Sequence, residues 1–350
     1  MKKIKVLVVD DSPLMLAWLK NIFSSDPAIE EVFSAQNPFE AKGILRKQTP
    51  DVITLDVEMP GMDGISFLKE IMAEHPLPVI MVSAYTKENS QITIKALSLG
   101  AVDFISKPGP GEKEEKESFP GRLLNMVREA ALARTHPSVS EFPEEDVRRA
   151  REDRELLILN LPRIVIGIGA STGGTQALNF LLTQVPARMP PLVIVQHMPG
   201  RFTGAFSEHL NQNSPLAVKE AKSGDRLAPG SVLVVPGDFH GLVRKDAGGF
   251  FLTLNEGSPV NHHRPSVDVL FYSLAETAKE KAVGILLTGM GEDGARGLLA
   301  MRKQGAKTLV QDEATSTVFG MPRAAINLGA AQAVVPLGDF PRQLINSIRT

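Results

Sequence analysis

The first hundred residues alternate between short apolar runs and amphipathic stretches of roughly ten residues. The apolar runs lie at 4–10, 31–35, 51–56, 78–84 and 101–108. Strands that are apolar throughout and are separated by helical spacing are typical of a parallel sheet covered on both faces. The pattern therefore predicts a five-stranded, doubly wound α/β domain of the flavodoxin-like kind, with its functional loops at the carboxyl ends of the strands.

A weaker pattern follows this domain. The charged run GEKEEKES at 111–118 predicts a solvated loop, and residues 119–135 restore helical spacing as a last helix. Residues 136–160 carry both charge signs and few apolar side chains, so they predict a linker with at most a surface helix. We therefore expect one domain at 1–125, the end of its last helix and the charged linker at 126–160, and a second domain at 161–350.

The remainder of the chain alternates in the same way, with hairpin character in its middle. Its apolar runs lie at 163–170, 191–198, 231–237, 249–257, 282–290, 308–311 and 332–337. The spacing predicts a second doubly wound parallel sheet, Rossmann-like, with a hairpin-containing middle section. The sequence beyond residue 338 has no informative pattern.

Composition narrows the class of protein. The 350 residues are 43% hydrophobic and 22% charged, which is typical of a globular protein. A net charge of −2 supplies no broad basic field, so we expect no nucleic-acid partner. The absence of cysteine excludes disulfides, thiolate metal sites and cysteine nucleophiles. No apolar run reaches the ~20 residues that span a bilayer, and the start resembles no signal peptide, so we expect a cytoplasmic protein without membrane insertion.

Three carboxylates mark the edge of the first predicted sheet. Asp10 and Asp11 follow the first strand and Asp56 ends the third, so all three should lie together. Crowded carboxylates repel one another, and a hard divalent cation relieves the repulsion. Mg²⁺ prefers oxygen ligands, so these three side chains, the backbone carbonyl of Glu58 and water predict a magnesium site.

Two further polar residues point to phosphoryl chemistry at the same edge. Ser83 ends the fourth predicted strand and Lys107 ends the fifth. A hydroxyl and an ammonium beside a magnesium-bound carboxylate match the oxygens of a transferred phosphoryl group. Asp56 is then the candidate nucleophile, which would form an aspartyl phosphate. Acidic residues at strand ends also serve as helix caps, but five polar or charged residues at four strand ends favour the phosphoryl site.

The segments VLVVDDS, LDVEMPGMDG and AVDFISKP resemble a response-regulator receiver domain over roughly residues 1–125. The resemblance implies phosphorylation of Asp56 by a histidine kinase. It also implies that Phe104 is the switch aromatic, which reorients with Ser83 upon phosphorylation.

The glycine-rich segment IGIGASTGGTQAL at 166–178 allows two kinds of chemistry. A dinucleotide site needs G-x-G-x-x-G and an acid about 20 residues on. The glycines at 167, 169, 173 and 174 are spaced one residue too widely, and the next strand ends in Gln196 and His197 instead of an acid. A nicotinamide cofactor is therefore disfavoured.

A nucleophilic serine is the alternative. Residues 169–173 satisfy G-x-S-x-G, which would expose Ser171 on a strand-to-helix turn and offer the Thr172 amide to an oxyanion. His197, at the end of the next predicted strand, is the candidate base. The loop GMGEDG at 289–294 supplies Glu292 or Asp293 to orient it.

Other histidines offer a rival arrangement. His262 and His263, with Asp225 or Asp238, would follow the Ser-Asp-His order of α/β-hydrolases. They are equally typical of a loop, so the strand-end position favours His197. The remaining histidines have structural contexts: His75, His136, His209 and His240.

The segments GIGASTGGTQAL, VIVQHMP, HHRPSVDVLF and LLTGMGEDGARGL resemble the C-terminal domain of chemotaxis protein-glutamate methylesterases, the CheB family. The resemblance implies a Ser171–His197–Asp293 triad, with the Met290 amide as a further oxyanion donor. It implies hydrolysis of glutamate γ-methyl esters on methyl-accepting chemotaxis receptors, with glutamine deamidation as a second activity and no cofactor for the hydrolysis.

A receiver joined to a hydrolase suggests control by phosphorylation. We hypothesise that the unphosphorylated receiver packs over the sheet edge that carries Ser171, and that phosphorylation loosens this packing. Two alternatives stay open: a response regulator with a non-catalytic binding output, and a hydrolase of small esters.

Overall fold

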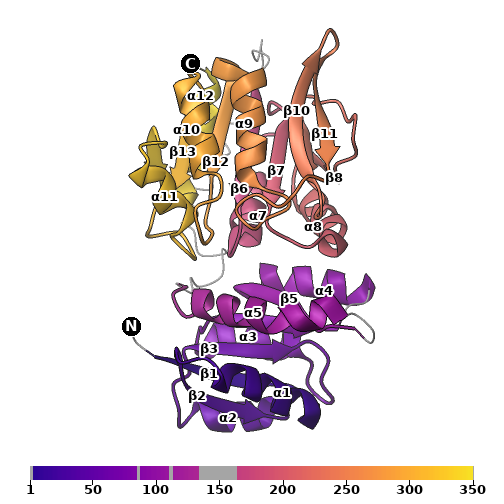
Figure 1. Cartoon of the computed structure of the whole chain (residues 1–350), viewed down its shortest axis with the longest axis vertical. Helices are drawn as coiled ribbons and strands as arrows, with labels where there is room; N and C mark the ends of the chain where they lie inside the picture. Colours follow the sequence, from indigo (N-terminus) through magenta and orange to yellow (C-terminus); the bar gives the residue numbers. More distant parts are fainter. Residues whose placement is uncertain (1–2, 85–86, 110–112, 134–163, 350) are drawn as a thin grey trace. The chain divides into compact units, whose positions relative to one another are not determined.

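The structure is a computed structural model that describes residues 3–84, 87–109, 113–133 and 164–349. The chain divides into two compact units, Met1–Ser140 and Glu141–Thr350 (Figure 1). The expected domain boundaries at 125 and 160 remain predictions, because the linker expected at 136–160 lies outside the described residues.

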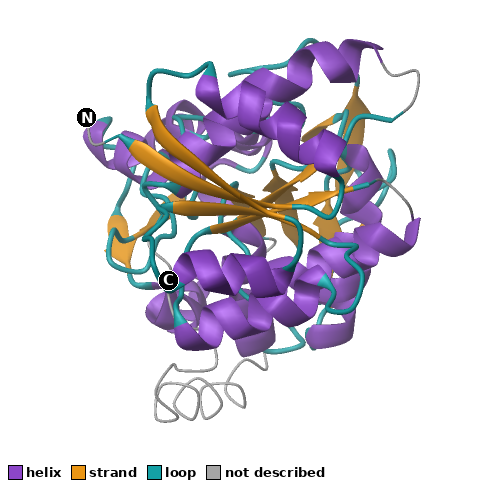
Figure 2. Ribbon diagram, turned by 90° about the horizontal axis from the view of Figure 1, so that it is seen from below, coloured by secondary structure: helices purple, strands orange, loops and turns teal. Residues whose placement is uncertain are grey.

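The first unit is a parallel five-stranded sheet with the strand order β2-β1-β3-β4-β5. Its strands are β1 (Ile4–Val9), β2 (Ile29–Ala35), β3 (Val52–Asp56), β4 (Val79–Ser83) and β5 (Asp103–Ser106). Its helices are α1 (Pro13–Ser24), α2 (Pro38–Leu45), α3 (Gly64–Glu74), α4 (Lys87–Ser98) and α5 (Lys113–Ala130). Helices lie on both sides of the strands (Figure 2). The predicted doubly wound α/β fold is confirmed.

Local sequence sets where these helices begin and how they pack. The Ser12 side chain accepts the amide hydrogen of Met15, and Pro13 occupies the first helical position of α1. The Trp18 ring of α1 stacks on Phe119 of α5 with centroids 4.9 Å apart. This aromatic pair holds α1 and α5 together on one face of the sheet.

One prediction in this unit is wrong. The charged run at 111–118, expected as a loop, is helical from Lys113 onward. Lysine and glutamate are good helix formers. Lys116, Glu117 and Ser118 are exposed, so they form a solvated first part of α5 rather than a connection.

The second unit is a parallel seven-stranded sheet with the strand order β14-β13-β12-β6-β7-β9-β8, plus an antiparallel hairpin. The sheet strands are β6 (Val165–Ala170), β7 (Leu192–Gln196), β8 (Ala217–Glu220), β9 (Ser231–Val234), β12 (Ala282–Leu286), β13 (Lys307–Gln311) and β14 (Ala333–Val335), and the hairpin is β10 (His240–Asp246) and β11 (Gly249–Asn255). Its helices are α7 (Gly174–Gln184), α8 (Gly200–Asn213), α9 (Val267–Thr277), η3 (Lys279–Lys281), α10 (Ala295–Lys303), α11 (Met321–Asn327), η4 (Leu337–Asp339) and α12 (Phe340–Arg349). The predicted parallel sheet with a hairpin-containing middle section is confirmed.

The segments β8, η4 and α12 had no predicted counterpart, and β10 was predicted only through the hairpin character of the middle section. Strand β8 is short and has an alternating burial pattern, so it gives little signal in the sequence. Helix α12 buries Phe340, Leu344, Ile345 and Ile348, which follow helical spacing, but its ten residues give only this one short apolar stripe.

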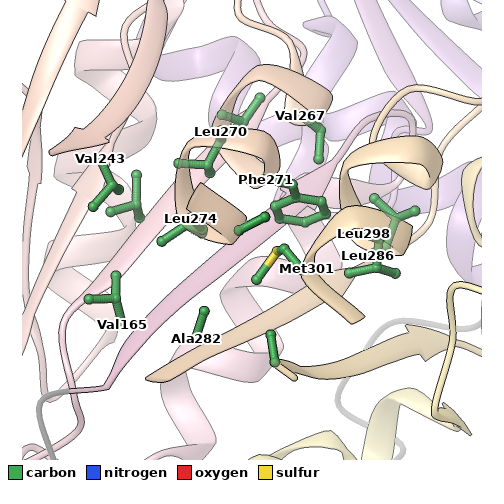
Figure 3. Close-up of a cluster of buried hydrophobic side chains, with 14 of the residues drawn as sticks. Val165, Val243, Val267, Leu270, Phe271, Leu274, Ala282, Leu286, Leu298 and Met301 are labelled. Carbon is green, nitrogen blue, oxygen red and sulfur yellow. The ribbon is translucent and has the colours of Figure 1, made fainter. Parts of the chain in front are cut away.

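One hydrophobic core cluster of the second unit forms where α9 and α10 cover β6 and β12. The side chains labelled in Figure 3 come from β6, β10, α9, β12 and α10 and meet in this cluster. A Cβ at Gly167 would lie 2.3 Å from Leu274 Cδ1, and one at Gly169 would lie 2.2 Å from Val267 Cγ1. The absence of these side chains lets α9 lie directly on β6.

Both sheets have a point where the strand order reverses direction. In the first sheet β1 lies between β2 and β3, and in the second β6 lies between β12 and β7. Loops that leave the carboxyl ends of such neighbouring strands diverge and open a crevice, where ligands of open α/β sheets bind. The functional residues expected from the sequence follow β1 and β3 in the first unit, and β6, β7 and β12 in the second.

None of the helices in the described part of the chain combines the length and apolarity needed to cross a membrane.

The close approach of α9 to β6 predicts the effect of adding one methyl group. We expect Gly169→Ala to lower the free energy of unfolding by about 1–3 kcal/mol, because the new Cβ overlaps Val267. Urea denaturation of the full chain measures the loss. The control is Gly204→Ala in α8, where the new Cβ would make only an ordinary 3.7 Å contact with Glu220; we expect a gain of about 0.5–1 kcal/mol. Equal effects at the two positions would contradict this account.

Candidate active site and phosphorylation site

Ser171 lies in a sharp turn between β6 and α7. Its backbone N–H donates to Thr288 O at 3.0 Å, and its carbonyl accepts from Gly174 N at 2.7 Å. Gly173 has a φ of 76°, and a Cβ there would lie 2.3 Å from the Thr317 hydroxyl. The strand–turn–helix context that a G-x-S-x-G motif requires is therefore present.

The other glycines of this segment serve packing. Gly167 and Gly169 make room for α9, and a Cβ at Gly174 would lie 2.3 Å from Gln196 Oε1. Close contact with protein atoms therefore accounts for these glycines without a bound pyrophosphate.

His197 follows β7, and both its backbone and its ring are hydrogen-bonded. Its backbone N–H donates to Ala170 O at 3.1 Å, and its ring Nε2 lies 2.8 Å from Asp293 Oδ2. Because a carboxylate only accepts, Nε2 carries the imidazole hydrogen and Nδ1 carries the lone pair. In the described part of the chain, Nδ1 has no hydrogen-bond partner. Nδ1 is thus the nitrogen able to take up a proton.

Ser171 and His197 come from adjacent strand ends. Ala170 and Gln196 are paired in the sheet, and the Gln196 side chain donates to Ser171 O at 2.9 Å. Among the described residues, no hydrogen bond joins the Ser171 hydroxyl to His197. Such a bond commonly tightens only once substrate is bound.

Asp293 is the most heavily hydrogen-bonded carboxylate of the site, and its side chain is 1% exposed. Its donors are His197 Nε2, Val267 N, Asp268 N, Ser266 Oγ and Asn261 Nδ2, at 2.8, 2.6, 3.3, 2.8 and 2.7 Å. Burial acts to raise the pKa of Asp293, but the charge and hydrogen bonds of its donors hold it well below the usual range. Glu292, the other acid considered, is exposed and pairs with Arg296 at 3.3 Å.

Asp293 also belongs to a reciprocal contact between two helices. It lies just before α10 and accepts the first amides of α9, whereas Asp268 in the first turn of α9 accepts Gly297 N of α10 at 2.6 Å. Each carboxylate thus faces the positive end of the other helix. The exchange fixes Asp293 relative to both helices.

His262 and His263, the alternative candidate bases, follow each other beside this site, but neither is paired with Asp225 or Asp238 in the part of the chain that the structure describes. The His263 ring stacks on the His197 ring with centroids 3.7 Å apart and planes 7° from parallel. His262 is exposed, and Asp225 pairs with Lys219 at 2.7 Å. Within the described residues, no hydrogen bond joins Asp225 or Asp238 to either histidine.

His240, considered structural, is held in one tautomer. Its Nδ1 accepts Ser266 N at 3.2 Å, so Nε2 donates to Ser258 O at 3.0 Å. His136 lies outside the described residues.

In the first unit, the three expected carboxylates meet. Asp10, Asp11 and Asp56 each offer an oxygen, and these oxygens lie within 4.8 Å of one another. Lys107 Nζ lies 2.8 Å from Asp10 and 2.6 Å from Asp56. Burial raises the pKa of Asp56 to about 6, opposed by the charge of Lys107 and its hydrogen bond. The Glu58 amide donates to Asp56 at 3.4 Å.

The remaining expected residues of this site lie at the neighbouring strand ends. Lys107 N donates to Ser83 O at 2.8 Å, which joins the ends of β4 and β5, and the Ser83 hydroxyl donates to Ala84 O at 3.0 Å. Phe104 is buried in β5.

Comparison with known proteins agrees with this geometry. The CheB methylesterase family model matches residues 166–344, and the response regulator receiver domain model matches residues 6–115. A protein-glutamate methylesterase/protein-glutamine glutaminase of Chromohalobacter salexigens is 44% identical over 343 residues, covering 98% of this chain and 96% of that protein. The chain belongs to the CheB methylesterase family. A Yersinia pestis protein of the same name is 44% identical over 352 residues, covering 99% of this chain and 98% of its own length.

A solved structure of the CheB methylesterase catalytic domain from Thermotoga maritima resembles the second unit. It is 38% identical, covers 52% of this chain and 97% of its own, and has a TM-score of 0.51. The receiver domain and the catalytic domain of the CheB family are thus both present in the chain.

The carboxylate cluster of the receiver domain fits a divalent cation. Three carboxylates face one ammonium group, that of Lys107, so the cluster carries an excess of two negative charges when all are ionised. The side-chain atoms that could coordinate the ion are all carboxylate oxygens, which Mg²⁺ prefers as ligands. When bound, the ion would supply positive charge to the phosphoryl oxygens.

Two residues beside Asp293 and His197 were not predicted from the sequence as members of this site. Asn261 donates to Asp293, and His263, considered only as a rival base, stacks on His197. Their signal was the position of NHHRP just before a predicted helix, but a loop of this kind does not reveal which way its side chains point.

The half-buried His263 ring predicts a pH dependence of stability. Burial, followed by the charges of His197 and His262, lowers the pKa of His263 to about 4. The negative charge of Asp293 acts in the opposite direction. An unfolded histidine binds its proton near pH 6.5. This contribution to stability is therefore fully present above about pH 6.5 and is lost as the pH falls toward 4.

Urea unfolding between pH 7 and pH 5 tests this. We expect His263→Phe to show a shallower loss of stability than wild type, by less than the ~1.4 kcal/mol per pH unit of one fully linked proton. Titrating groups elsewhere are common to both proteins and cancel in the difference. Identical slopes would mean that the His263 ring is not held neutral.

Proposed function

We propose that this CheB-family chain is a phosphorylation-activated serine esterase that hydrolyses glutamate γ-methyl esters on the cytoplasmic helices of methyl-accepting chemotaxis receptors. The observation that carries the proposal is the buried Asp293–His197 pair at the strand edge that also bears Ser171. The methylesterase/glutaminase names of the relatives support the substrate class, and glutamine deamidation is proposed as a second activity.

The triad geometry supports the following reaction. His197 Nδ1 takes the proton of the Ser171 hydroxyl, and the serine oxygen attacks the ester carbonyl. The tetrahedral intermediate collapses to a glutamyl ester of Ser171, and the leaving methoxide takes the proton from His197 to form methanol. Water then attacks the acyl-enzyme with the same assistance, releasing the glutamate carboxylate and restoring Ser171. Asp293 stays ionised and stabilises the imidazolium.

Backbone amides would stabilise the oxyanion. The Thr172 N–H belongs to the peptide whose carbonyl, Ser171 O, accepts Gln196 Nε2 at 2.9 Å and Gly174 N at 2.7 Å, and these bonds fix the orientation of that peptide. Met290 is exposed beside Gly289, and a Cβ at Gly289 would lie 2.7 Å from Ser171 Cβ. We propose the Thr172 and Met290 amides as the two donors; losing one such donor costs about 10²–10³ in rate.

The receiver domain would control the esterase. Asp56 is proposed to accept a phosphoryl group from a histidine kinase, with Mg²⁺ held by Asp10, Asp11, Asp56 and the Glu58 carbonyl. Lys107, and Ser83 after rotation of its hydroxyl, would contact the phosphoryl oxygens, and Phe104 would respond with Ser83 as the switch aromatic. The expected cytoplasmic location agrees with receptor helices as the substrate and stays a prediction.

Methanol release from methylated chemoreceptor fragments tests the esterase. We expect Ser171→Ala to lower kcat by about 10⁶-fold and Asp293→Asn by about 10⁴-fold, because the amide would favour the wrong imidazole tautomer. The matched control is Glu292→Gln, which changes the neighbouring exposed carboxylate and should leave kcat unchanged. Release that does not depend on Ser171 would refute the proposed reaction. Release from simple methyl esters without release from receptor fragments would favour a small-ester hydrolase.

Phosphorylation is tested with acetyl phosphate and Mg²⁺. We expect the wild-type chain to incorporate phosphate and to release methanol faster, while Asp56→Asn does neither and EDTA prevents both effects. The control is Asp63→Asn, a nearby exposed position where asparagine keeps the N-cap of α3. Labelling that survives in Asp56→Asn would place the phosphoryl group elsewhere.

A further inference from the structure

The segment just before α9 forms a tight two-residue turn. Val260 N donates to His263 O at 3.0 Å, and His263 N donates to Val260 O at 2.9 Å. The central residues, Asn261 and His262, have φ angles of 52° and 66°. Two successive positive φ values are typical of a type I′ turn, in which asparagine is favoured. The turn therefore has a defined geometry that fixes where its side chains lie.

Asn261 uses its side-chain amide to bridge two buried carboxylates. Nδ2 lies 2.8 Å from Asp268 Oδ2 and 2.7 Å from Asp293 Oδ1. An amide nitrogen has two hydrogens and no charge, so it satisfies one acceptor on each carboxylate. Burial raises the pKa of Asp268, and the charge of Asp293 contributes in the same direction. Without Asn261, two facing carboxylates would lose their common donor.

His263 covers one face of the His197 ring. The two rings are stacked 3.7 Å apart and almost parallel. A ring held in this way cannot tilt out of its plane without breaking the contact, so the plane of the His197 ring is restricted. The hydrogen bond from Nε2 to Asp293 restricts the same ring at its edge.

We propose that the turn Val260–His263 positions the triad, with Asn261 holding Asp293 and His263 holding the His197 ring so that Nδ1 faces Ser171. Asn261 and His263 are positioning residues, because they act on Asp293 and His197 and not on the substrate. This proposal rests on the proposed esterase function of the triad. A misplacement of the reacting groups by about 1 Å costs about 10²-fold in rate, so small shifts of either ring or carboxylate would be measurable.

The turn offers a matched pair of variants. Asn261→Gly and His262→Gly both place glycine at a positive φ, which it adopts without strain, so the backbone of the turn is retained. Only Asn261→Gly removes a donor to Asp293. We expect it to lower kcat for methanol release by about 10–100-fold with KM changed less than about twofold, whereas His262→Gly resembles wild type.

A second pair separates stacking from imidazole chemistry. His263→Phe keeps a flat ring against His197, and His263→Ala removes it. We expect His263→Ala to lose about tenfold in kcat and His263→Phe to retain most of the wild-type value. Equal losses in both variants would overturn stacking as the basis of positioning.

Nitrogen-15 NMR of the histidine side chains in the full-length chain gives a readout apart from activity. We expect wild-type His197 to be the Nε2–H tautomer at neutral pH, and Asn261→Gly to mix the two tautomers. A wild-type His197 protonated on Nδ1, or Asn261→Gly with unchanged tautomer and unchanged kcat, would overturn the proposal. If wild type releases no methanol in a Ser171-dependent way, the esterase function fails, while the His197 tautomers of the folded wild type and folded Asn261→Gly still decide the positioning.

Discussion

The catalytic domain depends on one buried carboxylate. Removing an ionised carboxylate from water costs several kcal/mol unless donors replace the lost hydration. Asp293 receives five such donors, including two amides at the N-terminus of α9, where the helix dipole also favours a negative charge. Asp293 Oδ2 accepts both Val267 N of α9 and His197 Nε2, so the contact that joins the loop after β12 to α9 also holds the His197 ring. Fold and chemistry use the same charge, so neither changes without the other.

The two domains use carboxylates at equivalent sheet edges with opposite electrostatics. Around Asp56, two other carboxylates face a single ammonium group, and burial raises the pKa of Asp56 to about 6. Around Asp293, the donors are neutral amides, a hydroxyl and an imidazole, and its pKa is held low. The first arrangement has excess negative charge that suits a divalent cation and a phosphoryl group. The second has a single compensated charge that suits stabilising an imidazolium. Environment, not residue type, thus separates the two chemistries.

Much of the site was predictable because parallel sheets bring strand ends together. The G-x-S-x-G motif singled out Ser171, and the rule that the carboxyl ends of parallel strands share an edge predicted that His197 and the loop 289–294 lie beside it. The sequence left Glu292 and Asp293 as alternatives, since both lie in the same loop. The structure distinguishes them by burial: Asp293 points at the start of α9, and Glu292 pairs with Arg296 at the surface. Sequence spacing could not distinguish the two acids, because their burial depends on where α9 begins in space.

The positions of Asn261 and His263 illustrate a further limit. Both lie in a turn whose two positive φ angles aim side chains in directions that neither helical nor strand periodicity describes. His263 reads in the sequence as a competing base, because a histidine near a serine motif has that chemistry. In the fold it lies flat against His197, in surroundings that disfavour its protonation, so it is a poor proton acceptor and a good ring to pack against. Its neutrality then matters to the neighbouring ring: a second cation at this distance would oppose the imidazolium that the proposed reaction forms on His197.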